Sequence, residues 1–565
     1  MLANWNVWAH GFAHTLQSSG GADVGEEVWF LAQTPWAVLH GVNPLANNWL
    51  NAPAGLNLMD NTTMPLLGLL GSPITLTLGP IATLNVLIGL GFAGSAATFY
   101  LMARQFVNWW PAAFFGGLLY GFSPFEVAAG HAHLFMTFAL VPPLVVLVVH
   151  HFVRAGCRSP WMHGIALGSC YAAQFYISAE AFASLVVMSA VAAVVGGLLL
   201  IRRWRTDIRQ VVRMGATAVT VAIVCLGYGA WTGLDGPSHI NGPAQQAQAI
   251  TALSSDPAGL VVPTDNQHFS FDAALGDTYV AQRDADWQIV TDLTVENGTY
   301  VGLPLLVVLV AGLFLLRRNR LAVFTGIMAA IAMILSMGSY LHVDGHRTSL
   351  PLPFIVLSHL PLLESSEASR YATYFWLFAA FLFCLTLARL HESRAGRRRG
   401  PAALVCLGVA AFALLPLAPA WPYPAAAATV PVWFTSAGRA VPVGTTVVVY
   451  PSASAADSSA MLWQAMADMT FRMPGGYAVF ASPPTEVASF NPTPSPLLAA
   501  LGLCAGGQTP DITPEQTRAA LRGWRASSVV VARETAGADC ATNLFDQALG
   551  AHRAEGGVSI WPVQG

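Results

Sequence analysis

Three carboxylates near the beginning of the chain have the chemistry of a general base. They are Asp23, Glu26 and Glu27, and they follow the glycine pair Gly20-Gly21. A carboxylate placed beside a hydroxyl group can take its proton during a reaction. The same residues also suit the first turn of a helix, where the helix dipole favours negative charge. The residues alone leave both interpretations open.

An aromatic stretch from Trp29 to Trp36 follows these carboxylates. Tryptophan is favoured at the interface between membrane and water, and amphipathic helices often lie there. We expect this stretch to form an interfacial helix, so that a carboxylate in front of it would face lipid head groups from the water side.

A second group of ionisable residues leads directly into an apolar run. It consists of Glu126, His131 and His133. Ionisable groups at membrane depth are costly and usually functional. Structural, acid–base and metal-binding roles all stay open, because two histidines two positions apart are a weak metal signature. We assign no metal ligand and no certain cofactor, although a divalent cation stays open.

The loop before residue 64 is rich in asparagine and includes Asn57 and Asp60. Amide and carboxylate groups suit a sugar, which offers both hydrogen-bond donors and acceptors. They also suit any loop that needs turns. Glu180 stands at another junction between apolar runs and carries the same alternatives as Glu126.

Arg370 stands at the start of a late apolar run. A guanidinium group at the outer interface can bind a phosphate through two hydrogen bonds. The neighbouring carboxylates Glu364 and Glu367 offer the alternative, which is an ion pair within the protein.

The elements that position these residues are membrane helices. The sequence is 55% hydrophobic and only 10% charged, whereas soluble proteins carry about 25% charged residues. A helix needs about 20 apolar residues to cross a bilayer. The sequence predicts ten spans, near residues 80–103, 110–124, 132–153, 161–178, 182–201, 211–231, 299–316, 321–341, 371–391 and 401–420.

Charge placement predicts the orientation of these spans. The basic residues are all arginine, and most of them fall in alternate loops, which the positive-inside rule assigns to the cytoplasm. Almost all acidic loop residues then lie on the other side. This topology places outside the membrane residues 1–63, the loops 124–131, 232–298 and 342–370 of a transmembrane domain spanning 64–420, and the segment 421–565.

The segment 421–565 is too long and too mixed in composition for a tail. Strand-like runs at 445–450, 527–532 and 558–562 alternate with helix-like runs at 459–469, 514–525 and 541–549. This alternation predicts a small extracytoplasmic α/β domain. Its two cysteines, Cys504 and Cys540, are predicted to form a disulfide in an oxidising compartment.

The sequence also argues against several classes of protein. A net charge of −3 gives no electrostatic reason to expect nucleic acid. The absence of lysine excludes a Walker A phosphate loop and Schiff-base chemistry. No apolar span precedes Gly20-Gly21, so we expect either a first helix missing from this sequence or translocation together with the next helices.

Several short motifs between residues 20 and 420 resemble bacterial membrane proteins of the GT-C glycosyltransferase superfamily, chiefly its little-characterised members. The motifs are Gly21-x-Asp23, His40-Gly41-x-Asn43-Pro44, Gly55-x-Asn57-Leu58-Met59-x-Asn61-Thr62, Met64-Pro65-Leu-Leu-Gly, Tyr120-Gly121-Phe122-Ser123-Pro124, Gly130-His131 and Arg370-Tyr371. The segment from Met461 to Tyr477 looks like the external domain that such proteins often append.

The resemblance implies an all-α polytopic membrane domain that transfers a sugar from a polyprenyl-phosphate donor to a cell-envelope acceptor. The reaction would take place among membrane lipids at the outer face of a bacterial plasma membrane. The superfamily's first-loop acid maps to Asp23, for which Glu26 or Glu27 could substitute. Glu126 and His131 map to the second external loop, and Arg370 becomes a candidate for the donor phosphate.

Two other functions stay open. A transporter or lipid flippase would carry polar residues near the middle of its helices and often an internal repeat. A non-enzymatic envelope assembly protein would use the external domain for binding, and loss of Asp23 would not change its activity.

Overall fold

The computed structural model describes residues 5–18, 22–200, 207–244, 252–270, 296, 299–360, 363–395, 399–490 and 493–563. They form two compact units. The first unit is built mainly from Ile88–Gly227 and Gln245–Tyr423, and the second from Trp5–Leu87, Tyr228–Ala244 and Pro424–Gly565. The division falls within two helices, α4 (Pro80–Ala103) and α11 (Ile208–Asp235).

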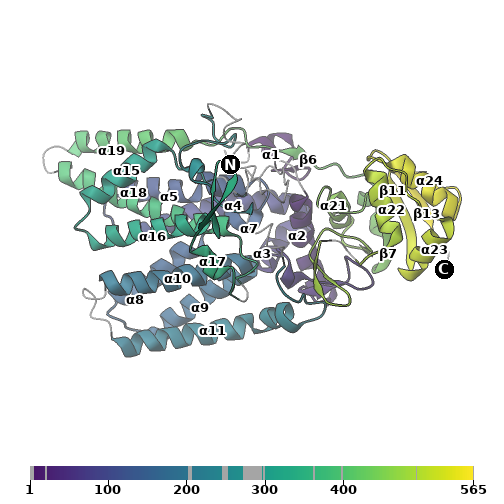
Figure 1. Ribbon diagram of the computed structural model, residues 1–565, viewed down its shortest axis with the longest axis horizontal. Helices are drawn as coiled ribbons and strands as arrows, with labels where there is room; N and C mark the ends of the chain where they lie inside the picture. Colours follow the sequence, from purple (N-terminus) through teal and green to yellow (C-terminus); the bar gives the residue numbers. More distant parts are fainter. Residues whose placement is uncertain are drawn as a thin grey trace. The chain divides into compact units, whose positions relative to one another are not determined.

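The described residues of the first unit form helices and one short hairpin (Figure 1). Its other helices are α5 (Trp110–Gly121), α6 (Pro124–Ala129), α7 (Leu134–Thr137), α8 (Val141–Arg154), α9 (Pro160–Ile177), α10 (Ala179–Leu200), α15 (Leu303–Leu315), α16 (Arg320–Ser336), α17 (Phe354–Leu357), α18 (Ala372–Ala395) and α19 (Arg399–Leu414). Strands β4 (Tyr340–Val343) and β5 (His346–Pro351) form the hairpin, and the 3-10 helices are η3 (Pro257–Leu260), η4 (Ala368–Tyr371) and η5 (Leu415–Leu417).

Five helices among the described residues are long and apolar enough to cross a membrane. They are Pro80–Ala103, Leu134–Arg154, Ala179–Leu199, Ile208–Asp235 and Ala368–Ser393. Each coincides with a predicted span. The other five predicted spans are also helical, but α5, α15, α16 and α19 have only 12, 13, 17 and 16 residues, and α9 includes His163 and Gln174. The predicted count of about ten spans is therefore not confirmed.

Helix α18 is the centre of the first unit. It packs against α5, α15, α16 and α19, and 94% of its most apolar window is buried in the protein. Small residues allow this close approach, because a Cβ atom on Gly312 of α15 would lie only 2.2 Å from the Thr386 hydroxyl. The residues just before α18, including Arg370, are therefore held at the end of a rigid helix.

The second unit joins the early part of the chain to its last part. Its early elements are α1 (Trp5–His10), β1 (Thr15–Leu16), α2 (Asp23–His40), β2 (Ala46–Asn47), β3 (Leu56–Asn57), η1 (Leu58–Asp60) and α3 (Pro65–Leu78). Its late elements are β6 (Ala426–Ala427), α20 (Val432–Thr435), η6 (Ala437–Ala440), β7 (Thr445–Tyr450), α21 (Ser459–Met466), β8 (Phe471–Arg472), β9 (Phe480–Ser482), β10 (Val487–Ser489), α22 (Pro496–Ala505), α23 (Pro514–Gly523), β11 (Ala526–Ala532), α24 (Ala538–Leu549), β12 (Arg553–Glu555) and β13 (Val558–Pro562).

Helix α2 corrects one expectation. The stretch containing Trp29 and Trp36 was expected to lie in the membrane interface, but every residue from Val24 to Ala37 is buried in the protein. The helix packs against α3 and α21. Its apolar residues surround the helix instead of forming one stripe, and such a helix is buried in a protein core.

The last part of the chain folds around a five-stranded sheet in the order β12-β13-β11-β7-β8. Strand β7 is parallel to both β11 and β8, whereas β13 is antiparallel to β11 and β12. The predicted runs at 445–450 and 558–562 coincide with β7 and β13. The expected α/β region is therefore present, and Figure 1 shows α22 and α24 beside β11.

One face of this sheet is covered by α22, α23 and α24. Alternate residues of β7 and β11, such as Tyr450 and Val529, join a core with Leu501, Phe545 and Trp561. This alternation follows from the two-residue period of a strand. The predicted disulfide between Cys504 and Cys540 is present and links α22 to α24.

Candidate functional site

Asp23 is the first residue of α2 and is only partly buried. Glu26 and Glu27 lie in the same helix but are 7% and 3% exposed. Asp23 is therefore the most accessible carboxylate of the three. The hydroxyl of Tyr477 donates a hydrogen bond of 3.0 Å to its Oδ1 atom. The positive end of the helix dipole also favours a charged carboxylate at this position.

Residues from the late part of the chain hold the beginning of α2 in place. The Ser458 hydroxyl donates to the carbonyl oxygen of Ala22 at 2.5 Å. A Cβ atom on Gly25 would lie 2.2 Å from the same hydroxyl, so only glycine fits there. Two turns further, the Trp29 indole donates to the Gln464 side chain at 2.5 Å. Ser458, at the start of α21, and Gln464, within it, therefore hold the beginning of α2 against that helix.

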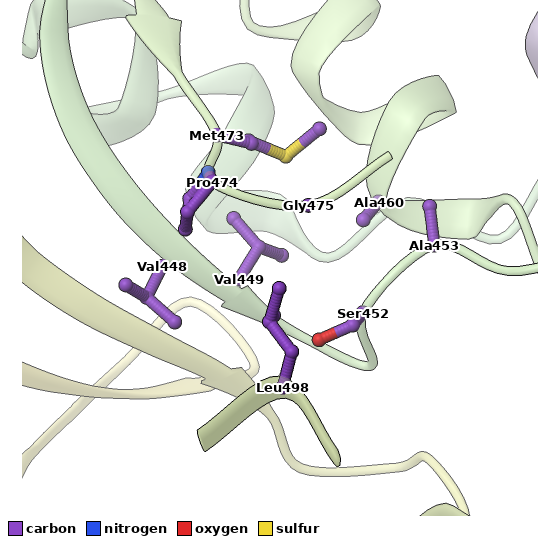
Figure 2. A pocket seen from close by; sticks show the side chains of 9 residues that line it. All are labelled: Val448, Val449, Ser452, Ala453, Ala460, Met473, Pro474, Gly475 and Leu498. Atoms are coloured by element: carbon purple, nitrogen blue, oxygen red, sulfur yellow. The ribbon is translucent and has the colours of Figure 1, made fainter. Parts of the chain in front are cut away.

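Tyr477 lies on the loop that follows β8. Figure 2 shows Met473, Pro474 and Gly475 of this loop lining a small pocket beside Val448 and Val449 of β7. The pocket is lined almost entirely by apolar groups, which suits packing better than sugar binding. Its role in this region is to anchor the loop that carries Tyr477.

Asn57 and Asp60 serve different purposes in the same loop. Asn57 is 1% exposed, and its amide accepts from the Met59 N–H and donates to the Thr232 carbonyl. Its amide is thus used to fold the loop, and a contact between Asn57 and a sugar stays a prediction. Burial raises the pKa of Asp60 to about 7, against the lowering effects of a hydrogen bond from Ile240 and the charge of His239.

Glu126 and His131 are both buried in the first unit. Glu126 is completely buried in α6, and burial raises the pKa of its carboxyl well above the ordinary value, while Thr373 lowers it. Neither Glu126 oxygen has a hydrogen bond of ordinary geometry to a described residue. Burial lowers the pKa of His131 to about 4, although a hydrogen bond with Asn266 raises it. Burial therefore favours the uncharged form of both side chains.

Arg370 is surrounded by three carboxylates. Its guanidinium group lies 2.5 Å from Glu296, 2.6 Å from Glu367 and 3.6 Å from Glu180. It also contacts the sulfur atom of Met136. The ion pair with Glu367 is one of the two predicted alternatives, whereas the partners Glu296 and Glu180 were not predicted.

Glu296 connects Arg370 to His133. Its Oε1 atom lies 2.5 Å from His133 Nε2, and both of its oxygens accept hydrogen bonds from Arg370. Burial alone raises the pKa of Glu296, but the charges of Arg370 and His133 outweigh it and hold that pKa well below its ordinary value. His133 and Arg370 therefore both contact the carboxylate of Glu296.

A cavity in the first unit lies next to this pair. Arg370 and Glu180 line it, together with the polar residues Gln174, Ser178 and Tyr374. The rest of its lining is mainly apolar, contributed by Phe135, Met136, Phe138, Ala139, Pro142 and Ala181. The cavity thus combines a charged end with an apolar wall, as a site for an amphipathic ligand does.

Comparison with solved structures shows which known fold this architecture resembles. The chain superposes over its full length on an arabinofuranosyltransferase, AftD from Mycobacteria, with a TM-score of 0.52 and 13% sequence identity. The chain has the GT-C fold. It spans 39% of the length of AftD. The fold that the resemblance implied is thus confirmed, although no protein-family model and no curated protein matches the sequence.

A second GT-C structure gives a weaker superposition. It is the archaeal oligosaccharyltransferase AglB from Archaeoglobus fulgidus, in complex with an inhibitory peptide and a dolichol-phosphate. The TM-score is 0.47 and the identity 11%, over 93% of this chain and 67% of AglB.

The predicted site residues fall into two sets, one in each compact unit. Asp23, Glu26, Glu27, Asn57 and Asp60 belong to the second unit, and Glu126, His131, His133 and Arg370 belong to the first. No group of three or more His, Cys, Asp or Glu side chains in the described ranges is arranged to hold a metal ion.

Sequence reasoning missed Glu296 and Tyr477. Glu296 lies in a long polar segment without periodicity, so nothing in its surroundings singles it out. Tyr477 follows Gly475-Gly476, and this pair of glycines after a strand was a usable signal for a close approach of two backbones.

Proposed function

We propose that this chain is a membrane glycosyltransferase that uses a polyprenyl-phosphate-linked sugar as its donor and a cell-envelope glycan as its acceptor. The proposal includes the outer face of a bacterial plasma membrane as the place of reaction. The GT-C fold and the apolar helices support the broad class. The finer assignment rests on the residues around Arg370.

The observation that carries the proposal is the set of contacts around the Glu296 carboxylate. His133 and Arg370 approach it at 2.5 Å each, beside a cavity whose wall is mainly apolar. A phosphate offers the same charge and the same acceptor oxygens as a carboxylate. We infer that the phosphate of the donor takes the position of Glu296, with the lipid chain against the apolar residues Phe135, Met136 and Phe138.

The chemistry requires a base as well as a phosphate site. The acceptor hydroxyl oxygen forms a bond to the anomeric carbon while the bond from that carbon to the phosphate oxygen breaks. Asp23 takes the hydroxyl proton, and the polyprenyl phosphate leaves. Cationic donors at the phosphate offset the charge that develops on it. Asp23 fits the first role because it is a carboxylate that is partly exposed and held in a fixed position.

The test uses the purified full-length chain in lipid nanodiscs. Farnesyl-phosphate arabinofuranose is the first donor to try, because the structure with a TM-score of 0.52 is that of an arabinofuranosyltransferase. Farnesyl phosphates that carry mannose or glucose complete the panel. Mass spectrometry would follow release of farnesyl phosphate in the presence of a cell-envelope glycan mixture.

The Asp23→Asn variant keeps the size of the side chain and removes its basicity. General-base catalysis contributes about 10²- to 10⁴-fold in rate, so transfer should fall by at least the lower figure. Glu26→Gln and Glu27→Gln are matched controls on the same helix, since both residues are buried. If only a control abolishes transfer, the base is assigned to the wrong residue. If all three variants keep transfer, none of these carboxylates is the base. The proposed function itself is wrong if the unchanged protein releases no farnesyl phosphate from any donor in the panel.

A further inference from the structure

The contact between Tyr477 and Asp23 joins residues 454 positions apart in the sequence. We propose that Tyr477 is a positioning residue for the base, so that the loop after β8 is part of the reaction site. This inference rests on the proposed function of Asp23. In this proposal, the Tyr477 hydroxyl binds Oδ1 of Asp23, so that the other carboxylate oxygen, Oδ2, faces the acceptor hydroxyl.

The hydroxyl group of Tyr477 acts as a donor. Burial and the negative charges of Asp23 and Glu26 raise its pKa above the ordinary value of a tyrosine, so it stays protonated at pH 7. Its ring stacks with that of Phe490 at a centroid distance of 6.5 Å. The stacked ring limits the position of the hydroxyl oxygen, and the hydrogen bond to Oδ1 holds the Asp23 carboxylate beside it.

The loop that carries Tyr477 is fixed by backbone hydrogen bonds to the early segment. Met473 N–H donates to the Trp49 carbonyl, and Ala52 N–H donates to the Met473 carbonyl, each at 2.9 Å. Asn51 N–H donates to the Gly475 carbonyl at 3.2 Å. A loop tied at three points holds a side chain more precisely than a free loop does.

The backbone at Gly476 also approaches this segment closely. A Cβ atom there would lie 3.2 Å from the side chain of Leu50. The glycine before Tyr477 thus allows the loop to lie against residues 49–52. The same loop begins at the carboxyl end of the short strand β8, which pairs with the first two residues of β7.

Among the described residues, few other ionisable groups lie on α2 near Asp23 or on the helices packed against it. Glu26 and Glu27 lie on the same helix, and Asp457 precedes α21, which packs against it. Helix α3, the other packed element, has no ionisable side chain. A change in the titration of Asp23 after removal of the Tyr477 hydroxyl can therefore be compared with changes at three named carboxylates.

The experiment replaces Tyr477 by Phe in the full-length chain and measures two quantities. The first is transfer from farnesyl-phosphate arabinofuranose as a function of pH. The second is labelling of Asp23 by a carbodiimide and glycine ethyl ester, followed by mass spectrometry. A donor to a carboxylate favours its charged form, so its removal should move the midpoint of labelling and the acidic limb of transfer to higher pH. We expect a shift of about one pH unit and a loss of roughly tenfold in transfer.

Tyr450→Phe is the matched control. It removes a hydroxyl that donates a hydrogen bond of 2.6 Å to the Ala536 carbonyl in the same unit. Both residues are far in sequence from the carboxylates of α2. It should leave the labelling midpoint of Asp23 unchanged. An unchanged midpoint in Tyr477→Phe as well would overturn the proposal, and so would a Tyr477→Phe protein that fails to accumulate in the membrane.

The two proposals fail in different ways. If Asp23→Asn keeps transfer while Tyr477→Phe still moves the labelling midpoint, the role of Asp23 as a base is wrong and the contact is only structural, which overturns the positioning role. If Asp23→Asn abolishes transfer while Tyr477→Phe behaves like the unchanged protein, only the inference about Tyr477 is wrong.

Discussion

Arg370 donates a hydrogen bond of 2.5 Å to Glu296, a residue 74 positions earlier in the sequence. With Glu180 and Glu367 also beside the guanidinium, three carboxylates share one arginine. If all four groups are ionised, the cluster carries two net negative charges before His133 is counted. The arginine therefore neutralises part of a buried excess of negative charge. We expect this to stabilise the folded protein.

Replacement of Arg370 by Ala should destabilise the protein. The side chain is 8% exposed, so the variant would leave buried carboxylates without their cation. Loss of one partner from a buried ion pair costs about 3–5 kcal/mol. Thermal unfolding in nanodiscs would measure the change, with the exposed Arg347→Ala as the control. A melting temperature equal to that of the unchanged protein would show that Arg370 does not hold this cluster together.

Replacement of Glu296 by Gln should strengthen binding of farnesyl phosphate. The variant removes the negative charge that competes with the phosphate for His133 and Arg370. A hydrogen bond to a charged group contributes about 1.5–3 kcal/mol, so the gain should be roughly tenfold or more. Microscale thermophoresis with Glu364→Gln as the control would measure it. Weaker binding by Glu296→Gln would mean that Glu296 is not in the place of a phosphate.

The membrane elements and the α/β region could be predicted because each depends on residues close together in sequence. Strand β7 is a run of valines and threonines, and α18 is a continuous apolar stretch. Both patterns predict their element without any knowledge of the partner. The count of ten spans is not confirmed, because apolar runs such as the one in α15 form helices of only 13 residues.

The site could be predicted only in part, because its contacts join distant residues. Asp23 and Arg370 stand out by residue type and by their place next to apolar runs. Their partners Tyr477 and Glu296 do not, since a single tyrosine or glutamate in a polar segment has no local signal. The burial of α2 was missed for the same reason, because its covering helix α21 comes more than 400 residues later, as the Trp29–Gln464 bond shows.

Asp60 should make stability depend on pH. Its pKa is about 7 in the folded protein and 3.8 without the surrounding structure, so the folded state binds the proton more tightly. The contribution of Asp60 to stability is then greatest below pH 4, falls as the pH rises to about 7, and is constant above that value. Asp60→Asn should remove this slope. Melting temperatures between pH 4 and 8 would test it, with the exposed Asp207→Asn as the control, and an unchanged slope would contradict it.

The disulfide between Cys504 and Cys540 should stabilise the sheet and its helices. It closes a loop of 36 positions, and such a cross-link typically contributes about 2–4 kcal/mol. Cys504→Ser should therefore lower the melting temperature of the full-length protein, whereas the exposed Cys225→Ser should not. Alkylation of both thiols in freshly isolated, non-reduced protein would show that the bond does not form.

The hydrogen bonds that join α2 to Ser458, Gln464 and Tyr477 can form only late in biosynthesis. Trp29 leaves the ribosome 435 residues before Gln464 does, and contacts between such distant segments are slow to form. During translation the acid at position 23 therefore has no tyrosine to orient it. We expect an arrested or truncated nascent chain to insert its helices and still be inert, so that competence for sugar transfer arrives only with nearly the whole polypeptide.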